Sequence, residues 1–268
     1  MKVVKFGGSS LASGNSVDKA LSIINADPER QVVVVSAPGK RTEDDIKVTD
    51  LMITYAYMSL RSNNYQDIAT RIFKRYELIA QYFELPEAEL EDIKQLLLTL
   101  PKLSYPNNDY RMATFKAHGE RLNAILIAKI LNHQGIKARF LEPKDVGLIV
   151  TGTSNNAEVN PETYVNLKRI KAAKDEKIIF PGFYGITPSG HIATFSRGGS
   201  DITGAILARG LNADLYENFT DVDAIFSANP HIVDQPKPIK RMTYQEMREL
   251  SYAGFSVFHD EALIPAIQ

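Results

Sequence analysis

Residues 194–201 read Thr-Phe-Ser-Arg-Gly-Gly-Ser-Asp, at the point where a predicted strand gives way to a helix over about Ser200–Leu211. Two adjacent glycines let the backbone turn tightly and approach a ligand closely. The first amides of the helix have no partners within it and attract anions. Arg197 adds a planar cation that can hold a carboxylate or a phosphate through two bonds. The stretch therefore predicts an anion site; in the alternative, it is an ordinary turn with Ser200 as the helix N-cap.

The start of the chain repeats this pattern. A strand predicted at Lys2–Phe6 runs into Gly7-Gly8-Ser9-Ser10, and a helix is predicted from about Ser16 to Ala26. Lys5 lies near the end of the strand, where its long side chain can reach over the loop. The turn has neither GxxxxGK[ST] nor GxGxxG, so it is neither a Walker A loop nor a dinucleotide fingerprint. Two such turns indicate two anion subsites, which would suit one phosphate-bearing and one carboxylate-bearing substrate.

Strands and helices alternate along most of the chain. The β-branched run Val32–Val35 is typical of a parallel strand buried on both faces. Further strands are predicted at Ile178–Phe180 and Ala213–Glu217, a hairpin at 185–193, and helices at Glu162–Ala173 and Tyr244–Tyr252. Between about Thr42 and His133 the strand signal disappears, which predicts a helical insertion. The expected fold is an α/β three-layer sandwich with a mostly parallel central sheet, whose ligands bind at the carboxyl ends of the strands.

The composition is that of an ordinary globular protein, with 44% hydrophobic and 24% charged residues and a net charge of −1. This balance gives no indication of a nucleic-acid or membrane partner. The absence of cysteine excludes disulfides, a thiol nucleophile and thiolate metal sites. The start of the chain shows no secretion signal, and the longest apolar strings are too short to span a bilayer. A cytoplasmic location is expected.

Six motifs resemble the aspartokinases of the amino-acid-kinase, carbamate-kinase-like superfamily. They occur in the family order: KFGGSS at 5–10, SAPGKRT at 36–42, GERL at 119–122, FPGFYG at 180–185, FSRGGSD at 195–201 and FTDVDAIFSANP at 219–230. The resemblance implies transfer of the γ-phosphoryl group of ATP, with Mg²⁺, to the side-chain carboxylate of L-aspartate. The product would be 4-phospho-L-aspartate, the first step toward lysine, threonine and methionine.

This chemistry needs no general base, because a carboxylate with a pKa near ~3.9 is already ionised at neutral pH. Catalysis would instead depend on positioning and on neutralising the charge of two anions that must meet. The five histidines accordingly show no catalytic or metal-binding spacing; they are His118, His133, His191, His231 and His259.

The resemblance implies a role for each matching residue. Lys5 would stabilise charge on the transferred phosphoryl group, and Asp201 would orient Lys5 and help place the metal-bound phosphates. The aspartate pocket would comprise Ser36, Thr42, Glu120, Arg197 and Ser200, with Arg197 holding a carboxylate and Glu120 the ammonium group. ATP would be bound by Lys5, Gly7, Gly8, Ser9, Thr220, Asp221, Phe226 and His231. No side chain is assigned as a metal ligand. Plainer alternatives are a surface lysine at Lys5, a solvated glutamate at Glu120 and a helix N-cap at Thr42.

The nucleotide side departs from the pattern of many relatives. His231 stands where an arginine directed at the phosphates is expected, and Ser256 stands where a lysine reaches the nucleotide. Two cations of the expected ATP clamp are therefore missing. Three nearby cations, which no motif supports, could replace them: Lys237, Lys240 and Arg241.

The expected organisation is one catalytic domain over 1–268, with an amino-acid-binding lobe at 1–200, an insertion at about 42–133 and a nucleotide-binding lobe at 201–268. Aspartokinases usually continue into ACT-type regulatory modules, which this chain lacks, and the full-length protein is expected to be a homo-oligomer, a dimer. Three alternatives stay open: a sister kinase acting on glutamate, acetylglutamate, carbamate or UMP; a catalytically weak nucleotide-binding module; and a dinucleotide-dependent oxidoreductase. The third lacks the glycine fingerprint.

Overall fold

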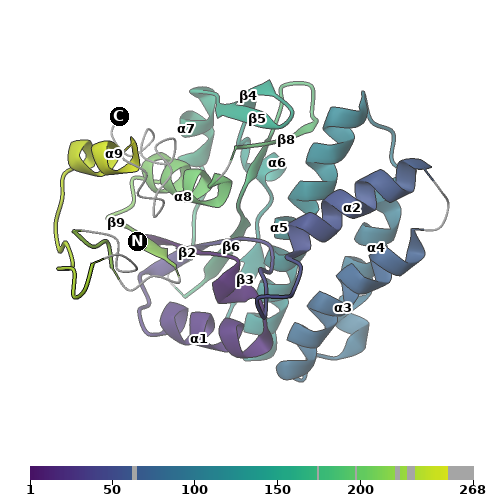
Figure 1. The fold of residues 1–268 in the computed structure, drawn as a ribbon, viewed down its shortest axis with the longest axis horizontal. Coiled ribbons are helices and arrows are strands. Elements are labelled where there is room, and N and C mark those ends of the chain that lie inside the picture. Colours follow the sequence, from purple (N-terminus) through teal and green to yellow (C-terminus); the bar gives the residue numbers. More distant parts are fainter. Residues whose placement is uncertain (62–64, 174, 197, 221–223, 228–232, 253–268) are drawn as a thin grey trace.

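A five-stranded sheet forms the centre of the molecule. The computed structural model describes residues 1–61, 65–173, 175–196, 198–220, 224–227 and 233–252. The sheet order is β3-β6-β2-β1-β9, and every neighbouring pair is parallel (Figure 1). The strands are β1 (Lys2–Phe6), β2 (Arg30–Val35), β3 (Ala138–Phe140), β6 (Lys177–Pro181) and β9 (Leu215–Phe219). The predicted mostly parallel central sheet is confirmed.

The strands end together at one edge of the sheet. Phe6 pairs with Val35 on one side and with Phe219 on the other, and Val35 pairs with Pro181. The loops that follow these four strands are therefore neighbours, although they are far apart in the sequence. This register brings together the first residues after β1, β2 and β9, which are Gly7, Ser36 and Thr220.

Alternate residues of the strands supply two separate cores, because successive side chains of a strand point to opposite faces. Val4, Phe6, Val33 and Val35 pack on one face, against α1 (Gly14–Asn25) and the helical insertion. Val3, Val32 and Val34 pack on the other face, and the cluster on that side includes residues of α7 (Glu162–Leu167) and α8 (Gly199–Gly210). Figure 1 shows α8 and α1 on opposite sides of the sheet.

The stretch after the second strand is helical, as predicted. Its elements are α2 (Val48–Arg61), α3 (Gln66–Tyr82), α4 (Glu91–Thr99) and α5 (Asn108–His133), with short 3-10 segments at Glu87–Leu90 and Leu100–Lys102. The long α5 lies between the sheet and the rest of the insertion, and most of its residues are buried. It is thus held on all sides, which fixes the position of any functional residue that it carries.

Most of the remaining elements follow the insertion in the sequence. They are the 3-10 segment Ser9–Leu11, α6 (Pro143–Val146), β4 (Val150–Thr153), β5 (Asn156–Val159), β7 (Tyr184–Ile186), β8 (Ile192–Thr194) and α9 (Tyr244–Tyr252). The predicted hairpin is confirmed, since β7 and β8 are antiparallel. The prediction of α9 is also confirmed. The sequence reading missed β3, β4, β5 and α6, which are only three or four residues long.

Three predicted boundaries were wrong. The strand expected at Ala213–Glu217 begins only at Leu215, because the Ala213 amide still donates to Ala208 and closes the end of α8. The helix expected at Glu162–Ala173 ends at Leu167, whose buried side chain packs against Gly210 before the chain turns back to β6. The helix expected from Ser16 begins at Gly14, because the Ser13 hydroxyl accepts from the Ser16 amide and caps it.

Candidate active site

An ion pair joins the two glycine turns. Nζ of Lys5, at the end of β1, lies 2.6 Å from Oδ1 of Asp201, in the first turn of α8. The lysine is only 7% exposed, and its Nζ lies 3.7 Å from where a Cβ would stand on Gly7. A surface lysine is therefore the wrong interpretation of Lys5. Its ammonium group is held at the carboxyl edge of the sheet, directly over the first glycine turn.

Two side chains of β9 also contact Asp201. Asn218 lies opposite Lys5 in the β1–β9 register, and its Nδ2 donates to Oδ1 of Asp201 at 3.0 Å. Tyr216, two residues earlier on the same face, donates its hydroxyl to the main-chain carbonyl of Asp201 at 3.3 Å. The sequence reading missed Asn218, because a polar residue on an edge strand carries no functional signal by itself; Tyr216 contacts only the main chain of Asp201.

The first glycine turn packs directly against the segment that follows β2. The Gly39 amide donates to the Gly8 carbonyl at 2.8 Å. A Cβ on Gly39 would lie 2.6 Å from the carbonyl carbon of Gly8, and a Cβ on Gly8 would lie 2.9 Å from the carbonyl oxygen of Ala37. Neither contact leaves room for a side chain, so the two backbones form one continuous surface. Gly39, to which the sequence reading assigned no role, is as necessary to it as Gly8.

The second glycine turn starts α8 without a side-chain cap. The N-cap position is occupied by Gly198, with φ of 74°, and no side chain caps the helix. The alternative that Ser200 is the N-cap is therefore wrong. Ser200 is buried inside the first turn instead, where its Oγ would lie 2.5 Å from a Cβ on Gly182. The left-handed conformation at Gly198 favours glycine, and the Gly198 carbonyl accepts from the amides of Asp201 and Ile202 at 2.8 and 3.0 Å.

Glu120 of α5 is buried against the segment after β2. The side chain is 5% exposed, and its Oε2 has no hydrogen-bond partner among the described residues. Burial raises the pKa of this carboxyl to about 8, although the Ala37 amide and the Lys116 ammonium group oppose the shift. A solvated helical glutamate is therefore the wrong interpretation. An orphaned buried carboxylate oxygen is suited to a cation such as a substrate ammonium group.

The segment that carries Ser36 and Thr42 is anchored by side chains from the insertion. Asn123 of α5 donates to the Ser36 carbonyl at 2.7 Å. The buried guanidinium of Arg75 donates to the carbonyls of Gly39 and Ile46 at 2.5 and 2.6 Å. Thr42 is exposed, in a turn where its carbonyl accepts from Asp45, and the next helix begins only at Val48. The alternative that Thr42 caps a helix is therefore wrong.

The predicted nucleotide side is described only in part. Arg197, Asp221 and His231 lie outside the described residues, as does Ser256. Thr220 is exposed directly after β9, and Phe226 pairs with Pro238 in an isolated antiparallel bridge. Within the described ranges, the structure thus joins Lys5, Asp201 and the first glycine turn, and it places Ser36 and Glu120 around the segment after β2.

The buried histidine of α5, His118, is fixed in a neutral form. Nδ1 of His118 lies 2.8 Å from the Thr114 carbonyl, and its Nε2 lies 3.0 Å from Nη1 of Arg121. Burial and the neighbouring guanidinium lower the pKa of His118 to about 3. The ring therefore donates through Nδ1 and accepts through Nε2 at neutral pH, and it serves to orient Arg121. No cluster of three or more His, Cys, Asp or Glu side chains suited to a metal occurs in the described part of the chain.

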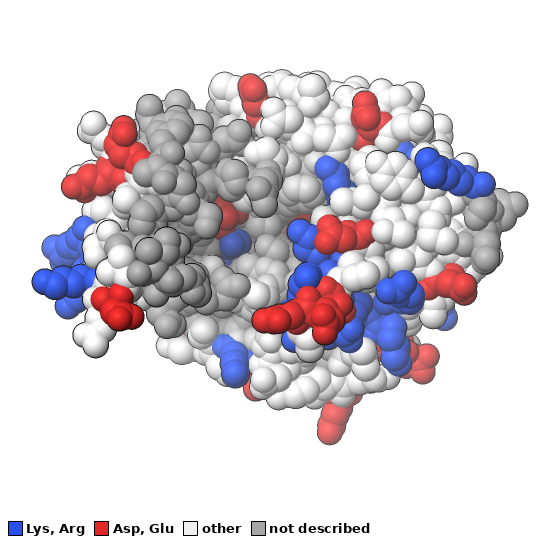
Figure 2. All heavy atoms as spheres, in the orientation of Figure 1, with Lys and Arg blue, Asp and Glu red and all other residues white. Residues whose placement is uncertain are grey.

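One face of the molecule is hollowed near its middle, with acidic and basic atoms visible in the hollow (Figure 2). Basic side chains gather on the side of this hollow that the helical insertion forms. Two ion pairs lie in the segment between β2 and α2 and at the start of α2: Arg41 lies 2.8 Å from Asp45, and Lys47 lies 3.9 Å from Asp50.

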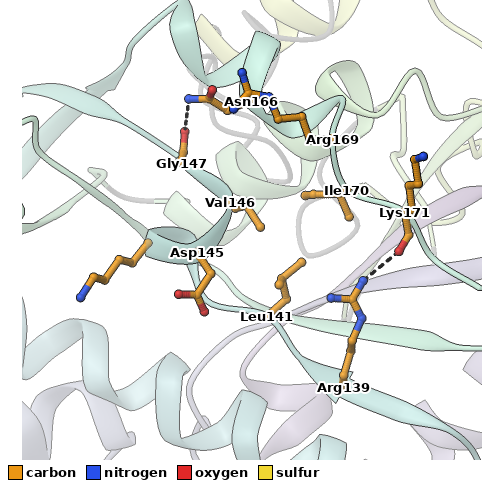
Figure 3. Close-up of a pocket in the computed structure, with 10 residues that line it drawn as sticks. Arg139, Leu141, Asp145, Val146, Gly147, Asn166, Arg169, Ile170 and Lys171 are labelled. Atoms are coloured by element: carbon orange, nitrogen blue, oxygen red, sulfur yellow. Dashed lines mark hydrogen bonds between the residues drawn. The ribbon is translucent and has the colours of Figure 1, made fainter.

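A separate cavity of about 610 Å³ lies beside the edge strand β3 (Figure 3). Its apolar wall includes Leu141, Val146 and Ile170, and basic residues stand around it. Arg139 donates to the Lys171 carbonyl at 2.9 Å and pairs with Glu176, so this guanidinium already has protein partners. The cavity shares no lining residue with the glycine turns.

Among the described helices, none is long and apolar enough to cross a membrane.

A parallel sheet with helices on both of its faces defines an α/β protein, and a lysine–aspartate pair lies at the carboxyl edge of this sheet. The sequence profile of the amino acid kinase family matches residues 1–268. The chain belongs to the amino acid kinase family.

Particular relatives are similar over the whole chain. Aspartokinase 3 of Bacillus subtilis (strain 168) is 54% identical over 268 residues, which are 100% of this chain and 59% of that protein. The aspartate kinase of Clostridium acetobutylicum is 36% identical with a TM-score of 0.82, covering 99% of this chain and 57% of that one. Escherichia coli aspartokinase III, in complex with aspartate and ADP, is 25% identical with a TM-score of 0.86. That match covers 100% of this chain and 59% of the E. coli chain. The chain thus spans less than two thirds of each relative.

Proposed function

We propose that this chain transfers the γ-phosphoryl group of ATP to the side-chain carboxylate of L-aspartate. The observation that carries the proposal is the Lys5–Asp201 pair, 2.6 Å apart between two glycine turns. The similarity to aspartokinases supports aspartate as the acceptor, because Aspartokinase 3 of Bacillus subtilis is 54% identical to this chain. In the reaction, a carboxylate oxygen of aspartate forms a bond to the γ-phosphorus while the bond to the β-phosphate oxygen breaks. ADP leaves, and no proton has to move.

The phosphate subsite would be the first glycine turn with Lys5 above it. Gly7, Gly8 and Ser9 would present amides and a hydroxyl to the phosphates, and the Lys5 ammonium group would neutralise charge that develops on the transferred group. Such preorganised donors act most strongly where water is excluded, and Lys5 is buried. Asp201 would hold Lys5 in position.

The amino-acid subsite would lie around the segment after β2. Glu120 would accept from the aspartate ammonium group through its unpartnered Oε2. Ser36, Thr42 and Ser200 would contact the rest of the substrate, and Arg197 would hold the carboxylate that does not react. The Glu120 carboxyl is hydrogen-bonded to the Ala37 amide, in the same segment whose Gly39 packs against Gly8.

Mg²⁺ would accompany ATP. No set of three or more potential metal ligands occurs within the described ranges, so phosphate oxygens would supply most of the coordination. Oδ1 of Asp201 accepts from Nζ of Lys5 and from Nδ2 of Asn218, whereas neither of these groups bonds to its Oδ2. This donor set fits a magnesium ion that arrives with the nucleotide, and the ion would further neutralise the charge between the two anions.

The nucleotide itself would lie beyond β9, against Thr220, Asp221, Phe226 and His231. We also propose the division into lobes at 1–200 and 201–268, a cytoplasmic location, and ACT-type regulation and dimer formation in the full-length protein. Lys237, Lys240 and Arg241 remain the candidates to replace the cations that His231 and Ser256 do not supply.

The activity is tested by trapping the acyl phosphate. The chain is incubated with ATP, Mg²⁺, L-aspartate and hydroxylamine, and aspartyl hydroxamate is measured. Hydroxamate from glutamate but not from aspartate would assign the chain to a sister kinase. No product from either amino acid, with the full-length protein also inactive, would favour a nucleotide-binding module without catalysis.

A further inference from the structure

Asn218 shares one oxygen of Asp201 with Lys5. Oδ1 of Asp201 lies 2.6 Å from Nζ of Lys5 and 3.0 Å from Nδ2 of Asn218. We infer that Asn218 is a positioning residue for phosphoryl transfer. Its amide keeps the Asp201 carboxylate in place while the Lys5 ammonium group interacts with the transferred phosphoryl group. The inference rests on the proposed function, because it assigns a task to the Lys5–Asp201 pair.

The placement of Asn218 follows from the strand register. Residues that pair across two parallel strands point to the same face of a sheet, and Asn218 pairs with Lys5. Both side chains therefore reach the face that α8 covers, where Asp201 lies. Because an ionised carboxylate can only accept hydrogen bonds, the amide must present its NH₂ group to Asp201.

Asn218 is a costly residue for stability alone. Asparagine is disfavoured in strands, and Oδ1 of Asn218 is buried with no hydrogen-bond partner among the described residues. An unpartnered buried polar atom lowers the stability of the folded state. An apolar residue of the same shape would avoid this cost, so the amide is better explained by its bond to Asp201 than by packing.

The shared oxygen explains why a second donor to Asp201 is useful. In the resting protein, the Lys5 ammonium group neutralises the Asp201 carboxylate. During the reaction, the same ammonium group must also interact with the phosphoryl oxygens. A second donor on the same oxygen weakens the hold of Asp201 on Lys5 and satisfies the carboxylate when Lys5 moves. Asn218 is neutral, so it does this without adding a charge that competes for Lys5.

The test compares three variants of neighbouring positions in the hydroxamate assay. Asn218→Leu keeps the size of the side chain and removes the donor. Asn218→Asp replaces the donor by a second carboxylate that can donate only when protonated. Tyr216→Phe is the matched control: it lies on the same strand and face, and it removes a bond to the Asp201 main chain but none to its carboxylate.

Asn218→Leu should lower kcat about tenfold, the lower end for partners that orient a functional group, with the aspartate KM within about two-fold. Tyr216→Phe should keep kcat within about two-fold. Asn218→Asp should be impaired at neutral pH and recover as the pH falls, because two adjacent carboxylates share a proton and the protonated one donates again. A merely structural role of Asn218 would not give this pH dependence.

Three outcomes would overturn the inference. The first is an active wild type whose Asn218→Leu variant retains kcat within two-fold. The second is an Asn218→Asp variant whose pH profile parallels that of the wild type. The third is a wild type that forms no hydroxamate, which would overturn the proposed function and, with it, this role; the first two leave the proposed function standing.

Discussion

The amide of Gly39 lies 2.8 Å from the carbonyl oxygen of Gly8, and each residue occupies space that a side chain of the other would need. This backbone contact joins the turn after β1 to the segment after β2. It makes the proposed phosphate and amino-acid subsites parts of one surface. A substitution at either glycine should therefore alter the shape of both subsites.

We predict that Gly39→Ala destabilises the protein by about 1–3 kcal/mol, the usual cost of forcing atoms into packed space. The new Cβ would meet backbone atoms of Gly8 and Ser9 at 2.6–2.8 Å, and a backbone cannot move aside as a flexible side chain can. Gly7→Ala is the matched control, because its Cβ would meet only ordinary contacts, at 3.7 Å or more. Urea unfolding measures both; equal midpoints for the two variants would contradict the prediction.

We predict that Lys5→Ala lowers kcat by roughly 10²-fold or more while the aspartate KM changes little, because the neutralised charge grows in the transition state. Lys2→Ala is the control on the same strand. Lys2 pairs with Asp27 at the opposite end of β1, in a partly exposed ion pair that should contribute little. Steady-state kinetics separates the two, and a Lys5→Ala enzyme within a few-fold of wild type would refute the role.

We predict that Glu120→Gln removes a pH dependence of stability. The pKa of Glu120 is raised from 4.5 to about 8 on burial. Between these values the folded protein keeps a proton that the unfolded chain releases, so the stabilising contribution of Glu120 is complete below about pH 4.5 and is lost as the pH rises through 8. The free energy of unfolding of Glu120→Gln should therefore exceed that of wild type increasingly from about pH 5 to pH 9.

The same variant should raise the aspartate KM. The bound ammonium group favours the ionised form of Glu120, and a neutral amide holds an ammonium group less well than a carboxylate does. Glu87→Gln, at an exposed position, is the control for both measurements. A constant stability difference between Glu120→Gln and wild type over this pH range would show that Glu120 does not titrate as a buried group.

We predict that Arg75→Met costs about 3 kcal/mol, because it leaves a largely buried Asp45 without one of its two cations and frees two loop carbonyls. The segment that carries Ser36 would lose its anchor, so the aspartate KM should rise more than the ATP KM. Arg41→Met is the control, since Arg41 binds the same Asp45 carboxylate from an exposed position. If the two variants unfold alike, the buried guanidinium is not the anchor.

The sequence predicted the elements whose local signals are strong. The apolar run at Val32–Val35 required a strand buried on both faces, and the long stretch of helical periodicity before His133 required an all-helical insertion. Short elements such as β3 and β4 gave no such signal, because three or four residues are too few for a period to be recognised.

Two kinds of information therefore define this protein. The sequence by itself determined the parallel sheet, the helical insertion, the two glycine turns and the family, because these depend on local periodicity and on residue types at fixed spacing. The resemblance to a family also led us to expect that Asp201 orients Lys5. Only the tertiary structure decided that Gly39 packs against Gly8, that Glu120 is buried against the segment after β2, and that Asn218 shares the Asp201 oxygen with Lys5. Each of these contacts joins residues far apart in the chain, and the register of the parallel strands, which no local pattern encodes, brings them together.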